Sequence, residues 1–157
     1  MLTVIPRGVF RNGFDLVDEA GRNLGGFAGS AWRETGEIQI GDERWEFRKQ
    51  RSKRFALAGP QGTYATAERT SVWSSVWQVA VGNRLYELTK RSWFSSGYEV
   101  RVGDQVVGTL NPKGVFGSKA AVDLPTDMPP PVQVFVIAVV MTQWRRDSAA
   151  ATAAASS

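Results

Sequence analysis

The sequence predicts a mainly β protein, in which a closed antiparallel barrel encloses one hydrophobic C-terminal helix. Two patterns support the barrel. Between residues 14 and 124, short segments alternate apolar and polar side chains, and glycine-containing turns separate these segments. A third pattern supports the helix, because one long apolar run follows a proline-rich connector near the end of the chain. The length of 157 residues suits a single domain with a sizeable core.

The alternation is clearest in the segments 45–47, 77–81 and 98–102. Each segment places apolar side chains on one face and polar side chains on the other, as in an antiparallel sheet with one solvated face. Helical periodicity is weak throughout this region, and hairpin follows hairpin. We therefore expect a meander that closes on itself, since closure protects the edge strands.

Glycine followed by Asp or Asn marks three of the expected turns. The segments 40–43, 81–84 and 102–105 each place this pair between a β-branched residue and a polar one. Two-residue hairpin turns need positive φ, which glycine adopts at little cost. We expect hairpins at these three positions and longer turns at 18–21 and 59–62.

The composition changes at residues 123–131, where prolines are too frequent for a strand interior. An extended connector is expected there. The apolar run 132–144 follows, with Pro131 as a suitable first helical residue and two arginines after its end. These features predict a helix near 131–147, although the valine-rich composition leaves a buried strand as an alternative.

A helix that is apolar on all sides lies inside protein or inside lipid. The run 132–144 would rise about 20 Å, whereas a bilayer core is about 30 Å thick. We therefore favour a core helix that fills the barrel over a membrane-inserted segment. The expected domain spans 1–147, and the Ala- and Ser-rich segment 148–157 is expected to be a tail that extends the helix and frays.

The order of these elements resembles the tubby C-terminal, LURP-one-related and phospholipid scramblase superfamily. The similarity rests on the short strands, the connector 123–131 and the single hydrophobic helix that ends at Trp144, Arg145 and Arg146. The segments 56–59, 77–79 and 114–117 are also similar in character. The resemblance implies a bacterial-type single-domain member with about twelve strands around a central helix.

The chain contains neither Cys nor His. Thiolate nucleophiles, imidazole bases and Cys/His zinc sites are therefore excluded. The chain also lacks the Cys-rich palmitoylation segment and the acidic calcium-binding stretch of scramblases, which argues against a calcium-activated scramblase. We expect a protein that is not an enzyme and that binds no cofactor and no stoichiometric transition metal.

The densest charge in the chain is a basic cluster at 48–54, at an expected turn between a strand that ends near Phe47 and one that starts at Phe55. The basic residues are Arg48, Lys49, Arg51, Lys53 and Arg54. Such a cluster attracts anionic lipid headgroups by about 1 kcal/mol per basic residue near a membrane surface. The alternative is a solvated hairpin tip, and nucleic acid is not expected because no recognition motif accompanies the charge.

Trp93 and Phe94 form a second candidate site, because two adjacent aromatic residues in an extended segment cannot both face inward. They are expected either to contact a partner or to cap one end of the barrel.

Together these features favour a binding or regulatory module that contacts anionic membrane lipid or a small apolar ligand. The alternative is a structural or interaction protein that docks into a larger assembly, for which the tail is a candidate contact. The N-terminal residues 1–12 contain no secretory signal pattern. We therefore expect a cytoplasmic protein, with peripheral contact to the inner membrane face.

Overall fold

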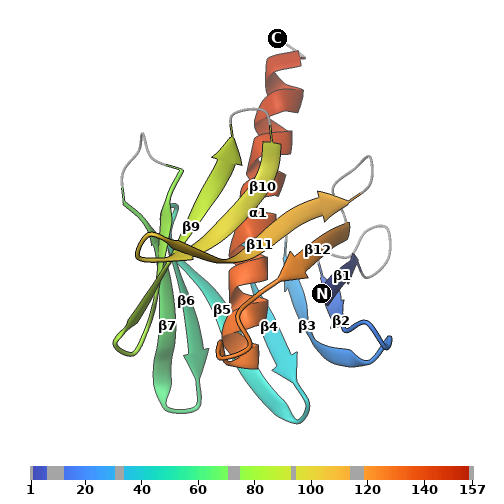
Figure 1. Cartoon of the computed structure of the whole chain (residues 1–157), viewed down its shortest axis with the longest axis vertical. Coiled ribbons are helices and arrows are strands. Elements are labelled where there is room, and N and C mark those ends of the chain that lie inside the picture. The colour runs from blue at the N-terminus through green and yellow to red at the C-terminus, as the bar shows by residue number, and fades with distance from the viewer. Residues whose placement is uncertain are drawn as a thin grey trace.

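A computed structural model describes residues 2–6, 13–30, 34–70, 75–92, 95–113 and 119–155. These residues form β-strands and a single α-helix (Figure 1). The strands are β1 (Leu2–Pro6), β2 (Phe14–Val17), β3 (Asn23–Ser30), β4 (Thr35–Ile40), β5 (Glu43–Arg51), β6 (Arg54–Gly59), β7 (Gly62–Arg69), β8 (Trp77–Val81), β9 (Arg84–Ser92), β10 (Ser95–Val102), β11 (Gln105–Lys113) and β12 (Lys119–Asp123). The helix is α1 (Pro130–Ala155).

The twelve strands form one closed antiparallel barrel, which confirms the predicted fold class. Each strand pairs with its neighbours in the sequence, and β1 pairs with β12 to close the ring through Leu2↔Val122 and Val4↔Ala120. Closure gives every strand two partners, which removes the free edges that an open sheet would expose.

All three predicted glycine hairpins form. Each has a two-residue turn whose first residue is glycine with φ between 58° and 60°, namely Gly41, Gly82 and Gly103. The turn expected to be longer at 59–62 is also a two-residue turn, because Gly59 pairs with Gly62.

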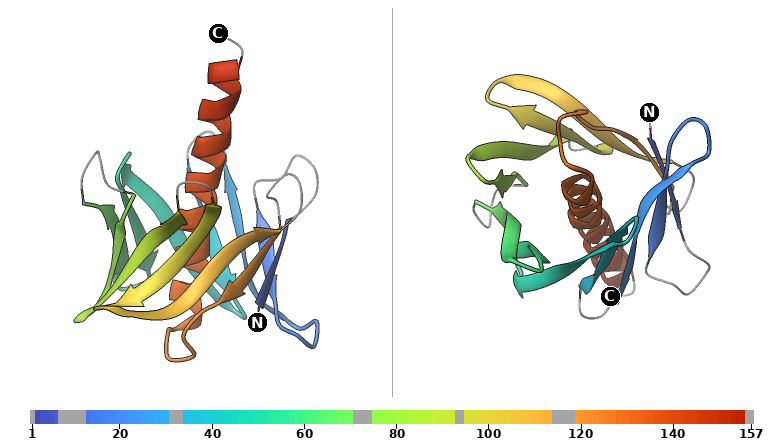
Figure 2. Two further views of the ribbon diagram at one scale, coloured as in Figure 1. Left: turned by 45° about the horizontal axis from the view of Figure 1, so that its top comes forward. Right: turned by 90° about the horizontal axis from the view of Figure 1, so that it is seen from below.

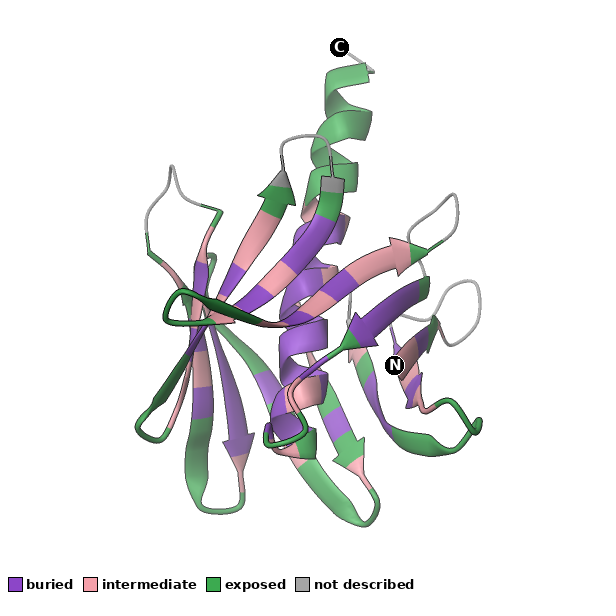
Figure 3. Ribbon diagram, in the orientation of Figure 1, coloured by how far each residue is buried: buried purple, intermediate pink, exposed green. Residues whose placement is uncertain are grey.

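Helix α1 is longer than the predicted 131–147. It begins at Pro130 and continues through most of the expected tail to Ala155. The barrel surrounds its first half (Figure 2), whereas residues 147–155 are exposed beyond the barrel end (Figure 3). Within the described part of the chain, no helix combines the length and the apolar character that crossing a bilayer requires.

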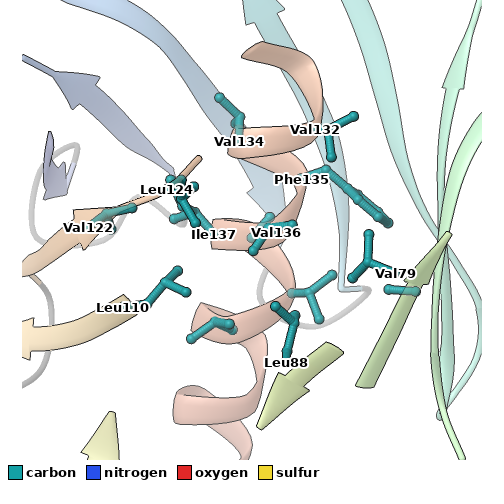
Figure 4. Packing of buried hydrophobic residues seen from close by; sticks show 14 of the residues in the cluster. Val79, Leu88, Leu110, Val122, Leu124, Val132, Val134, Phe135, Val136 and Ile137 are labelled. Atoms are coloured by element: carbon teal, nitrogen blue, oxygen red, sulfur yellow. The ribbon is translucent and has the colours of Figure 1, made fainter. Parts of the chain in front are cut away.

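The buried half of α1 is the centre of the hydrophobic core (Figure 4). Val132, Val136 and Val139 are 0% exposed, which confirms the predicted burial of this run within the barrel. Aromatic rings continue the packing into the sheet. The ring centroids of Phe135 and Phe47 lie 5.7 Å apart.

Replacement of Val136 by Asp tests this burial. Val136→Asp would place an unpaired charge in the core, at a cost of several kcal/mol that approaches the whole stability of a typical domain. We expect no folded protein in circular dichroism or in a thermal melt. Ala149→Asp, on the exposed part of the same helix, should melt within a few degrees of the wild type, and a Val136→Asp variant with a wild-type melt would contradict the core position.

Candidate functional site

The basic cluster at 48–54 contains the expected turn between two strands, but the turn is shorter than the sequence suggested. Strand β5 continues to Arg51 and β6 begins at Arg54, so only Ser52 and Lys53 form the turn. The strand continues past Phe47 because this stretch lies at the mouth of the barrel. Charged side chains there reach solvent from either face of the sheet, so the change to a charged composition does not end the strand.

Three of the five basic side chains in this cluster form ion pairs. The pairs are Arg48 with Glu46, Lys49 with Glu34 at 2.8 Å, and Arg54 with Glu68 at 2.9 Å. Arg51 and Lys53 have no ion pair with any residue in the described ranges. The charge that remains available to a ligand is therefore concentrated at the β5–β6 turn and the residue before it.

Glu34 connects the β5–β6 hairpin to the helix. Its carboxylate accepts hydrogen bonds from Arg146 Nε at 2.7 Å and from Arg146 Nη2 at 2.8 Å, and it also pairs with Lys49. Arg146 Nη1 donates to the carbonyl oxygen of Ser52 at 2.8 Å, and the guanidinium lies 5.5 Å from the centre of the Phe55 ring. These contacts fix α1 against β5 and β6 where the helix leaves the barrel.

The pKa of Glu34 lies below its ordinary value. Partial burial acts to raise the pKa of this carboxyl, but hydrogen bonds from Arg146 and Lys49 and the charges of both cations lower it by more. The side chain of Glu34 is only 14% exposed, so solvent screens these interactions weakly. Glu34 is therefore ionised at neutral pH and compensates two basic side chains.

Other contacts hold the opposite side of the helix exit. The indole Nε1 of Trp144 donates to the carbonyl oxygen of Ser96, and its ring lies 6.5 Å from that of Tyr98. Lys90 pairs with Asp147 at 3.0 Å. Burial raises the pKa of Tyr98 to about 12, so the phenol is neutral at physiological pH.

Basic side chains outnumber acidic ones around the emerging helix. We call this group the helix-exit cluster. It contains Lys49, Arg69, Lys90, Arg145 and Arg146 with the carboxylates Glu34 and Asp147. Burial lowers the pKa of the Arg145 guanidinium, an effect that the charge of Glu34 opposes. Arg145 and Arg69 have no ion pair within the part of the chain that the structure describes.

Sequence reasoning missed the members of the helix-exit cluster on β7 and β9 and overlooked Glu34. Arg69 could have been found from the sequence. Ala65 and Ala67 face inward, and because side chains of a strand alternate between its faces, the next inward position is Arg69. The other predicted site, Trp93 and Phe94, lies outside the described residues. The described ranges contain no group of three or more acidic side chains that could hold a metal ion.

Comparisons of the chain with protein-family models, with curated proteins and with solved structures found no match. The geometry of the barrel end therefore carries the functional conclusion.

The pH dependence of stability tests the role of Glu34. Because the pKa of Glu34 is lower in the folded state, its ionised carboxylate stabilises the protein at pH values above the ordinary pKa of 4.5. This contribution disappears as the pH falls through the folded-state pKa. Glu34→Gln should cost about 2 kcal/mol at neutral pH, because it removes the negative charge that compensates Arg146 and Lys49 and replaces one acceptor oxygen with an N–H donor. Urea unfolding at several pH values should show a weaker acid dependence for this variant than for the wild type.

Asp104→Asn provides the control, since Asp104 is an exposed residue of the β10–β11 turn. It should reproduce the acid dependence of the wild type. Identical pH profiles for Glu34→Gln and the wild type would show that Glu34 does not stabilise the helix exit.

Proposed function

We propose that the chain is a non-enzymatic binding module, which contacts anionic membrane lipid through the barrel end where α1 emerges. The observation that carries this proposal is the excess of basic side chains in the helix-exit cluster, next to Arg51 and Lys53, which form no ion pair with a described residue. Each basic residue near an anionic surface contributes about 1 kcal/mol, so several on one end give salt-sensitive attachment.

The fold supports a proposed relationship to the tubby-like, LURP-one-related and scramblase-like superfamily. The support is the twelve-stranded meander, closed as a barrel around one C-terminal helix. Tubby domains bind phosphoinositide headgroups through basic side chains on the barrel surface, which agrees with a lipid ligand. The absence of Cys and His supports a role without catalysis.

A membrane surface suits this barrel better than a small apolar ligand. The lumen already contains the buried side chains of α1, which pack against strands around the ring. An apolar ligand would have to displace that packing, whereas a charged surface needs only the exposed barrel end. We accordingly propose a cytoplasmic location at the inner face of the membrane, where anionic lipids are concentrated.

The exposed end of α1 favours a second candidate function. Residues 148–155 project beyond the barrel as helix (Figure 3), and every one of them is exposed. A helix that projects from a domain can dock into a partner. An interaction protein within a larger assembly is therefore the alternative proposal.

Vesicle flotation tests the lipid proposal. The full chain should float with phosphatidylcholine vesicles that contain phosphatidylserine and not with phosphatidylcholine alone. Binding should disappear between about 0.05 and 0.5 M salt, because the Debye length falls to a few ångströms. Arg51→Ser combined with Lys53→Ser should weaken binding by about tenfold or more, since both cations lack ion pairs among the described residues.

Arg44→Ser combined with Arg84→Ser is the matched control. Arg44 and Arg84 follow the β4–β5 and β8–β9 turns, which lie at the other end of the barrel. This variant should bind like the wild type. If the wild type does not float at low salt, or if the Arg51/Lys53 variant binds as tightly as the wild type, the interaction-protein alternative is favoured.

A further inference from the structure

Two buried hydrogen-bond donors at the helix-exit end have no partner in the described structure. They are Nε of Arg69 and Nε2 of Gln143. Gln143 is only 6% exposed, so its amide cannot rely on bulk water. Native proteins leave few buried polar groups unpaired, and such exceptions call for a water, an ion or a ligand. Because both groups are N–H donors, the missing partner is an acceptor.

The rotation of α1 directs Gln143 toward β7 and β8. On the helix, Gln143 falls between Arg146, which covers Phe55 on β6, and Asp147, which pairs with Lys90 on β9. The barrel order places β7 and β8 between β6 and β9. The side chain of Gln143 therefore faces the strands that carry the second unpaired donor.

Arg69 lies at the end of β7 and faces the same interior. It continues the inward series of Ala65 and Ala67, which are 2% and 0% exposed, and it pairs across the ladder with Trp77. Its charge also lowers the pKa of Tyr98, in opposition to the effect of burial. The guanidinium is thus close enough to act on a side chain of β10, on the far side of β8 and β9.

Among the residues that the structure describes, no carboxylate compensates Arg69. Glu34 is shared by Lys49 and Arg146, and Asp147 is occupied by Lys90. Arg69 has no ion pair or side-chain hydrogen bond with any other residue in the ranges that the structure describes. An anion with several acceptor oxygens would satisfy both its charge and its planar array of donors.

We propose that Arg69 and Gln143 bind one phosphate group between α1 and β7, at the end of the barrel where the helix emerges. Phosphate matches the site because its oxygens accept from two separate elements at once, and its charge offsets the surplus of cations nearby. A soluble phosphomonoester and a phospholipid headgroup both present this group. The site does not depend on the proposed membrane contact, since a soluble phosphate would also occupy it.

Nuclear magnetic resonance of the ¹⁵N-labelled full chain tests the site directly. Sodium phosphate is added stepwise, and a parallel titration with sodium chloride at equal ionic strength is the reference. The signals of Arg69 Nε–H and of the Gln143 side-chain amide are followed. Both signals should move together and saturate. Arg69→Met and Gln143→Leu should each weaken binding by about tenfold or more, because each removes a donor to a charged acceptor.

Arg48→Met is the matched control, because Arg48 lies on an exposed part of β5 and pairs with Glu46. It should leave the phosphate affinity unchanged. If phosphate moves neither wild-type signal, the two donors bind water and the proposal is wrong. The wild-type titration is decisive even if Arg69→Met fails to fold, and Arg69→Lys then tests whether the guanidinium is required.

The source of the phosphate is identified by two further ligands, glycerol phosphate in solution and vesicles that contain phosphatidic acid. If Arg69→Met loses glycerol phosphate binding but still floats with the vesicles, the site serves a soluble phosphomonoester. Loss of both assigns a lipid headgroup to it. Failure of wild-type vesicle binding together with a saturable phosphate titration would contradict the membrane proposal and leave the phosphate site supported.

Discussion

The structure depends on the burial of one apolar helix inside a barrel too wide to fill itself. Twelve strands enclose a lumen that their own inward side chains do not fill, and the buried half of α1 occupies it. Each large apolar side chain buried in this way contributes about 1.5–3 kcal/mol, so helix and barrel stabilise each other. The position of every group at the helix exit follows from this packing.

The helix exit becomes a candidate site because the side chains of α1 change character within one turn. After the apolar run, Trp144, Arg146 and Asp147 point in different directions and contact β10, β6 and β9. Arg146 and Asp147 form ion pairs with Glu34 and Lys90, whereas the buried amide nitrogen of Gln143 has no hydrogen-bond partner among the described residues. The contacts that stabilise the helix and the groups of the proposed binding site therefore share one end of the barrel. The ion pairs fix the helix, and the donors left over are the groups that a ligand can use.

Local patterns were sufficient to predict the barrel, the glycine hairpins and the buried helix. Alternation, turn chemistry and the length of the apolar run each act within a few neighbouring residues. The site was only partly predictable. Composition revealed the basic cluster, but Glu34 meets Arg146 across 112 positions of the chain, and the relation of Gln143 to Arg69 depends on the rotation of the helix within the ring. The end of β5 was misplaced because solvent at the barrel mouth tolerates inward-facing charges such as Lys49.

Amide hydrogen exchange of the intact chain measures most directly whether α1 is the core of this barrel. If it is, the amides from Val134 to Thr142 exchange only when the whole protein unfolds, at the same opening free energy as the slowest amides of the strands. The amides of the exposed end, from Ala149 to Ala155, exchange much faster by local fraying. Rapid exchange throughout α1, while the strands remain protected, would show that the barrel is stable without its helix and would contradict this interpretation.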